Sequence, residues 1–219
     1  MARVWFSTFW CARTPSPALR SQLVLQVVVS QNDSPYAIVN GQKLIYMSIQ
    51  DEILDRWNRG MLFPVLPKAP GATIRRALFV NEVLNAVLNS PEGDAEWEKR
   101  VGELRADLEV FVESPTIGAK YLFLLYPARD AVWEIRSTSP DPSIRVLCLF
   151  AWKDILIATG HALREDLGGW QSREWKVVKR DARAAWRRLF NPYQPRPEVD
   201  AKALITGALD GKYFRTSGR

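Results

Sequence analysis

A regular series of basic side chains is the feature of this sequence with the clearest chemistry. The series recurs at intervals of three or four residues, so in a helix its members share one face: Arg173, Lys176, Arg180, Arg183 and Arg187. Between residues 170 and 190, seven basic residues stand against two acidic ones, which gives the segment a charge of +5. Closely spaced cations favour binding of phosphate groups or of an acidic partner, and the alternative is an ordinary solvated helix face.

Three further residues could take part in phosphate chemistry. Arg136 lies near the end of one predicted strand, Arg145 is the only charged residue in the next, and His161 directly follows the last one. A guanidinium in an apolar strand needs a carboxylate or an open concave face, because an unpaired buried charge is very costly. Arg145 is therefore either paired with Glu134 or part of an anion site, and His161 is either structural or an acid or base.

These residues lie in three short motifs that occur in order along the chain. The motifs are Trp133-Glu134-Ile135-Arg136, Ile144-Arg145-Val146-Leu147-Cys148 and Gly160-His161-Ala162-Leu163-Arg164. Together with the basic helix that follows, they resemble the RelE/ParE toxin superfamily, most closely its HigB-like, phage-related branch. That family characteristically shows a W-E-L-R strand, a Y-R-V-L-Y strand and an H-G-F or H-A-F strand end. The resemblance covers roughly residues 73–190.

The resemblance implies the toxin of a type II toxin–antitoxin system, most often a metal-independent endoribonuclease that cleaves mRNA on the translating ribosome. Its partners would be mRNA, the ribosome and a cognate antitoxin protein, with no cofactor. Such cleavage needs cations that stabilise a crowded phosphorane and groups that shuttle protons. By the resemblance, Arg136 and Arg145 hold the phosphate, His161 is the acid or base, and Arg164 joins the basic helix in binding RNA. We expect Arg136, Arg145 and His161 to converge on one concave surface.

One departure from the family pattern favours a different function. The family usually has a Lys-Lys pair after its histidine segment, whereas this chain has Arg164-Glu165-Asp166. Two carboxylates beside a phosphate site repel RNA. The alternative is therefore a non-catalytic RelE-fold protein that binds or regulates, either phage-related or acting on a protein target.

The elements that must position these residues indicate an α+β fold. The order predicted from residue 73 is β-α-α-β-β-β-β-α, with a helix over 95–112 and strands over 120–126, 131–137, 144–152 and 155–158. The resemblance makes this a curved RelE-like antiparallel sheet of four or five strands, with two N-terminal helices and a C-terminal basic helix. Residues 1–70 form an N-terminal extension of unknown role, with strands over 22–29 and 43–49 and a helix over 49–59. A proline-rich linker follows, and 191–219 is a C-terminal tail.

Composition sets the remaining limits. Apolar residues make up 47% of the 219, enough to bury a core, and the net charge of +6 is consistent with a polyanionic partner. Two distant cysteines and one histidine offer no metal-ligand spacing, so we expect no metal site. No apolar stretch reaches the length of a membrane span, and we expect a cytoplasmic protein that does not bind membranes.

Overall fold

The computed structural model describes residues 48–214, apart from short gaps at 90–91, 138 and 170–171. It also describes the backbone of an antiparallel hairpin, β1 (Tyr36–Val39) and β2 (Gln42–Ile45). The strand predicted over 22–29 lies outside these residues. Of the strand predicted over 43–49, residues 43–45 lie in β2 and Ile49 begins a helix.

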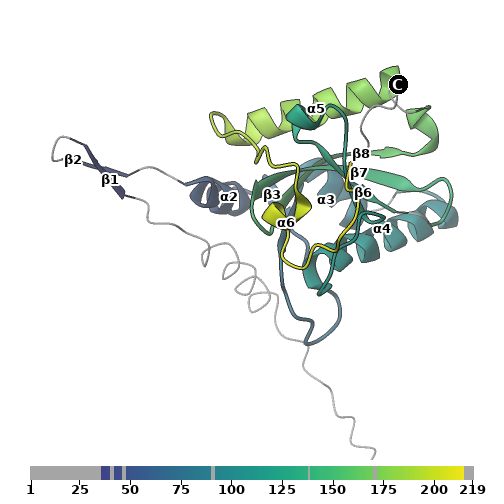
Figure 1. Ribbon diagram of the computed structural model, residues 1–219. Coiled ribbons are helices and arrows are strands. Elements are labelled where there is room, and N and C mark those ends of the chain that lie inside the picture. Colours follow the sequence, from purple (N-terminus) through teal and green to yellow (C-terminus); the bar gives the residue numbers. More distant parts are fainter. Residues whose placement is uncertain are drawn as a thin grey trace, which may run out of the picture.

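A six-stranded, mostly antiparallel sheet organises the rest of the chain (Figure 1). Its spatial order is β3-β4-β8-β7-β6-β5. The strands are β3 (Leu62–Pro64), β4 (Ala77–Asn81), β5 (Leu122–Leu124), β6 (Trp133–Arg136), β7 (Ile144–Trp152) and β8 (Ile155–Leu163). The helices are α2 (Ile49–Asn58), α3 (Glu82–Asn89), α4 (Ala95–Glu113), α5 (Arg173–Phe190) and α6 (Ala201–Leu204), with single 3₁₀ turns at η1 (Ala128–Asp130) and η2 (Glu165–Leu167).

Local sequence explains where the main helices begin. The side chain of Asp94 accepts a hydrogen bond from Trp97 N at the start of α4, and Ser172 accepts one from Trp175 N at the start of α5. Ser48 and Asp51 form a reciprocal capping box on α2. These bonds satisfy backbone N–H groups that have no partner inside the helix, so each helix starts at a defined residue.

Alternation along the strands divides the core into two layers. On β7, Val146, Cys148 and Phe150 point to one face, where α3 and α4 pack. Leu147 and Leu149 point to the other face, where α2 and α5 pack. Figure 1 shows α5 above the sheet and α4 below it. The sheet is thus covered on both faces, and the basic helix and the 95–112 helix lie on opposite sides.

The predicted order of elements from residue 73 is confirmed, and the predicted pairing is corrected. Residues 73–190 supply five strands, as expected, but β4 runs parallel to β8, and β3 from the preceding segment adds a sixth strand. The α3–α4 pair carries the chain to the far edge at β5, and the β5–β8 meander returns it beside β4 in the same direction. Residues 64–71, expected to be a linker between domains, connect the neighbouring strands β3 and β4.

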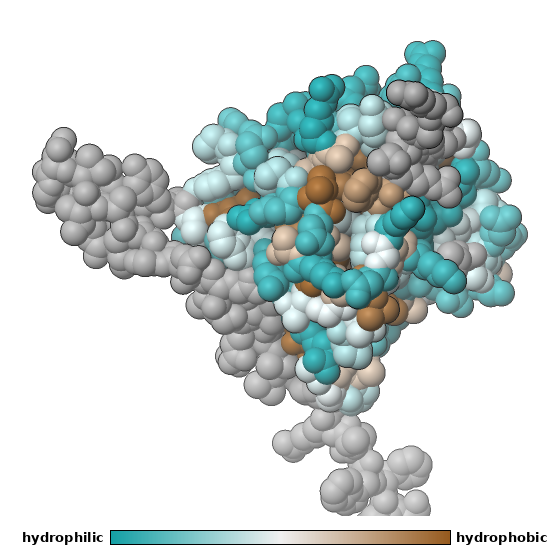
Figure 2. Space-filling view, in the orientation of Figure 1, coloured by the Kyte–Doolittle hydropathy of each residue, from teal (hydrophilic) through white to brown (hydrophobic). Residues whose placement is uncertain are grey.

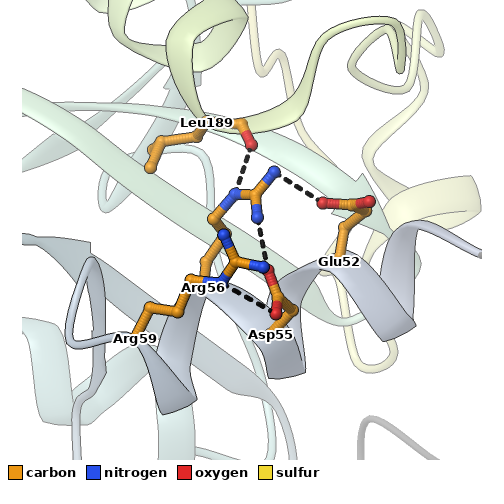
Figure 3. A network of polar contacts seen from close by, with 5 residues as sticks. All are labelled: Glu52, Asp55, Arg56, Arg59 and Leu189. Atoms are coloured by element: carbon orange, nitrogen blue, oxygen red, sulfur yellow. Dashed lines mark hydrogen bonds and ion pairs between the residues drawn. The ribbon is translucent and has the colours of Figure 1, made fainter.

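Helix α2 is fixed to the end of α5 by a polar network (Figure 3). The Arg56 guanidinium donates to the carbonyl oxygen of Leu189 at 2.9 Å and pairs with Glu52 at 2.7 Å and with Asp55. Arg59 also contacts Asp55, at 3.0 Å. Because basic groups at a helix C-terminus bond its free carbonyls, Arg56 stabilises the end of α5 and joins α2 to it.

The C-terminal segment covers the β5 edge of the sheet. Short bridges join Ile117 to Ala208 and Leu124 to Phe214. The buried Arg76 guanidinium donates to the carbonyl oxygens of Phe111, Ser114 and Thr206, which joins α4 to this segment. A covered edge cannot pair with another chain, so these residues complete the sheet.

Candidate nucleic-acid interface

The exposed side of α5 carries the basic series as expected. Arg173, Lys176, Arg180 and Arg187 are exposed and Arg183 is half-buried, whereas Trp175 and Leu189 are buried against the sheet. Val178 is only partly buried. The surface over α5 is hydrophilic in Figure 2. We call these five cations the basic face of α5.

A small cavity of about 210 Å³ lies between this face and the turn after β5. Its wall on the α5 side consists of basic residues: Lys176, Lys179, Arg180, Arg183 and Arg187. Pro127 and Asp130, from the turn and η1, form the opposite wall. Asp130 pairs with Arg183 at 2.7 Å, between Asp130 Oδ1 and Arg183 Nη1. The cavity thus combines five cations with one carboxylate, and that carboxylate is already engaged.

Lys179 differs from its neighbours because its side chain is buried. Its ammonium donates to the carbonyl oxygen of Tyr126. Burial lowers the pKa of Lys179, the nearby Asp130 opposes that effect, and Lys176 adds to it. By sequence, Lys179 is one of the seven basic residues between 170 and 190, but it is not a member of the regular series of five. Its spacing, three residues after Lys176 and four before Arg183, is the signal that could have placed it with them.

Arg136 and Arg145 share one ion-pair network with Glu134. Arg136 Nε lies 3.2 Å from one carboxylate oxygen, and Arg145 Nε lies 3.4 Å from the other. Glu134 is buried, with 3% of its surface exposed. The Arg136 guanidinium also stacks on Phe123, 3.9 Å from the ring centroid, and Arg145 donates to Ser137 O at 3.2 Å. The Arg145–Glu134 pair, one of the two alternatives from the sequence, is therefore present.

Strand register places His161 away from this network. Arg145 faces Arg136 on one side and Ala162 on the other, so these residues share the face covered by α5. His161 faces Val146, whose side chain packs under α3 and α4. Successive residues of a strand point to opposite faces, so His161 and Arg145 lie on opposite sides of the sheet. The expected convergence of Arg136, Arg145 and His161 is wrong.

The reason for this error is the length of β8. The β7–β8 hairpin stays paired as far as Ile144 and Leu163, so His161 lies inside the strand rather than after it. Burial lowers the pKa of His161. The residue borders a cavity of about 260 Å³ between α3, α5 and the part of β8 that follows its pairing with β4, and Asn81 and Arg188 also line this cavity.

The segment after β8 contains Arg164-Glu165-Asp166, which stand where the RelE/ParE family usually has a Lys-Lys pair. Arg164 donates from Nη1 to the carbonyl oxygen of Gly168 at 2.9 Å. Its charge helps to lower the pKa of Arg145, after the larger effects of burial and of Arg136 and against the effect of Glu134. Glu165 and Asp166 are exposed in η2.

The described residues contain neither a metal-binding cluster nor a membrane-spanning helix. Among them, no group of three or more His, Cys, Asp or Glu could hold a metal ion. In the same part of the chain, no helix is long and apolar enough to cross a membrane. The chain matches no protein-family model, and comparisons with curated proteins and with solved structures also find no match.

Proposed function

We propose that this chain is a non-catalytic RNA-binding protein on a RelE-like scaffold, and that the basic face of α5 is its RNA-binding surface. The observation that carries the proposal is the exposure of closely spaced cations on one side of α5, with a cation-lined cavity beside them. The order of strands and helices from β4 to α5, which matches the order expected from the RelE-like motifs, supports the choice of scaffold.

The charges on α5 favour a surface that binds a polyanion over an ordinary solvated helix face. Of the five cations, Arg183 pairs with Asp130 and Arg180 with Asp181. Lys176 and Arg187 form no ion pair within the described residues. Unneutralised cations spaced along a helix raise the local potential, and a phosphate backbone that replaces their counterions gains free energy from ion release.

Burial of the apolar side of α5 favours RNA over a membrane surface. Helices that lie on membranes insert an apolar face between lipids. The large apolar side chains of α5, including Trp175, Trp186 and Leu189, are buried in the core between α5 and the sheet. What α5 offers to a partner is therefore charge, without the apolar face that membrane insertion requires.

The ion-pair network supports binding without cleavage. A nuclease of this kind needs its phosphate-binding arginines and its acid or base on one surface. Here Glu134 holds Arg136 and Arg145, and the strand register puts His161 on the other face of the sheet. We therefore favour the non-catalytic alternative over the endoribonuclease.

Charge reversal on α5 tests the proposal. The variant combines Arg173→Glu, Arg180→Glu and Arg187→Glu, and its control makes the same change at exposed lysines on other surfaces, Lys68, Lys99 and Lys120. Binding of a labelled single-stranded RNA is followed by fluorescence anisotropy across a salt titration. Each phosphate contact contributes about −0.7 to the slope of log K against log salt, so we expect about −3.5 for the wild type and the control if all five cations of the basic face contact phosphates.

The two variants separate local from global charge. We expect the α5 variant to lose more than about tenfold in affinity and most of its salt dependence, since three of its contacts become repulsive. Equal losses in both variants would mean that net charge alone attracts RNA, and the α5 face would then be an ordinary solvated surface.

A further inference from the structure

The cavity between α5 and η1 has features that a flat basic surface lacks. Four of its cations are the Lys176, Arg180, Arg183 and Arg187 members of the basic face, and the fifth, Lys179, lies at its buried side. We propose that this cavity is a phosphate-binding subsite, in which the ammonium of Lys179 and the guanidinium of Arg183 hold one backbone phosphate of an RNA strand. The inference rests on the proposed RNA binding and adds to it a defined position for one phosphate.

Lys179 and Arg183 keep hydrogen-bond donors for a ligand. A lysine ammonium has three N–H donors and an arginine guanidinium has five. The Lys179 ammonium donates one hydrogen bond, to Tyr126 O, and the Arg183 guanidinium is fixed through Nη1 on Asp130. Each side chain is therefore held in place by one partner and keeps donors for an acceptor with several oxygens, such as a phosphate.

Lys179 and Arg183 are also preorganised for binding. Exposed lysine and arginine side chains lose rotamer freedom when they bind an anion, which reduces the net gain. Lys179 and Arg183 are already held by the turn after β5, through Tyr126 and Asp130. A phosphate that enters the cavity meets these two fixed donors, whereas Lys176 and Arg187, which form no ion pair within the described residues, must be ordered on binding.

The size and charge of the cavity suit a single phosphate group. The volume of about 210 Å³ is below the roughly 300–1,000 Å³ of sites that enclose a whole small molecule. A phosphate group fits, with its sugars and bases outside along α5. The single carboxylate in the wall, Asp130, is paired with Arg183, so the cavity keeps a clear excess of positive charge for an anion.

The test uses the full chain and a labelled single-stranded RNA of about 12 nucleotides. Lys179→Met removes the buried ammonium and keeps the apolar stem, and Lys176→Gln changes the exposed rim in case the first variant does not fold. Two controls keep the cavity intact: Arg173→Gln changes the basic face outside it, and Lys99→Met changes an exposed lysine on α4. Binding is measured at constant ionic strength while inorganic phosphate replaces chloride.

We expect Lys179→Met to weaken RNA binding roughly 10- to 100-fold, the range for hydrogen bonds to a charged group, and Lys176→Gln to weaken it less. Arg173→Gln should cost only about two- to threefold, and Lys99→Met nothing. Inorganic phosphate should displace RNA from the wild type and from both controls beyond the effect of chloride, and should lose that advantage with Lys179→Met.

The outcomes separate this inference from the proposed function. Normal RNA binding by Lys179→Met and Lys176→Gln, or equal competition by phosphate with and without Lys179, would overturn the subsite while RNA binding to α5 stands. If the wild type binds no RNA, yet inorganic phosphate shifts the Cε resonance of Lys179, the cavity takes free phosphate. In that case both the RNA source and the proposed function are wrong.

Discussion

Replacing Glu134 by glutamine distinguishes a structural ion-pair network from a phosphate-binding site. Glu134→Gln keeps the size of the side chain and removes the charge that both Arg136 and Arg145 contact. If the network stabilises the fold, the two guanidinium groups lose their counterion and the domain becomes less stable. If the two arginines bind RNA, the charge of Glu134 repels the RNA, and removing that charge should strengthen RNA binding.

The magnitude follows from burial. Removing one partner of a buried ion pair costs about 3–5 kcal/mol, because the other charge stays in a poorly solvated place. The Arg136 and Arg145 side chains keep 25% and 15% exposure, so water replaces part of the lost interaction. We therefore expect a loss of about 2–3 kcal/mol in the free energy of unfolding, or about 5–10 °C in Tm for a chain of this size.

The assay is urea unfolding followed by tryptophan fluorescence and circular dichroism. Glu98→Gln on α4 is the matched control, since Glu98 is exposed, and it should change stability by less than about 0.5 kcal/mol. The double variant Glu134→Gln with Arg145→Met should recover part of the loss, because no unpaired guanidinium remains at position 145. Unchanged stability together with tighter RNA binding in Glu134→Gln would refute the structural assignment and restore the arginines as phosphate ligands.

Two further perturbations test the placement of His161 and of the C-terminal segment. Burial lowers the pKa of His161 below its ordinary value of 6.5, so between the two values the unfolded chain binds more protons and stability rises with pH. The wild type should therefore lose stability on acidification from about pH 7 to about pH 5, and His161→Gln should lose less; identical pH profiles would show that His161 is not buried as described. Gly207 has φ +83, and a Cβ there would lie 2.1 Å from Pro115 O. Gly207→Ala should therefore lower the free energy of unfolding by about 1–3 kcal/mol. It should also speed amide exchange at Leu124, whose N–H donates to Tyr213 O. Gly102→Ala, in open space on α4, should instead stabilise by about 0.5–1 kcal/mol, and equal exchange in both variants would contradict the docking of this segment.

Local sequence patterns predicted the helices and the meander, because a short stretch of sequence determines each of these elements. The apolar spacing of α4 and α5 and the turns between β5 and β8 depend on neighbours within a few residues. The parallel contact of β4 with β8 and the addition of β3 to the sheet depend on residues far apart in the chain. Pairing between such distant strands depends on how the layers of the fold pack, so the periodicity of apolar residues along the sequence does not predict it.

The candidate site shows the same limit. Arg136, Arg145 and Glu134 could be grouped from the sequence, because alternation on adjacent strands puts them on one face. His161 was misplaced because the strand-like apolar run ends at Ala158 while the pairing continues to Leu163. The cavity beside α5 could not be foreseen, since Lys179 meets Tyr126 and Asp130 across about fifty residues of chain.

The fate of an mRNA in contact with the protein is the most direct test of RNA binding without cleavage. A labelled mRNA is incubated with translating ribosomes and the wild-type chain, and its ends are mapped by primer extension. We expect the RNA to be bound and to remain intact, with binding lost in the α5 charge-reversal variant. New RNA ends that appear with the wild type and disappear with Arg145→Ala would contradict the account and establish an endoribonuclease.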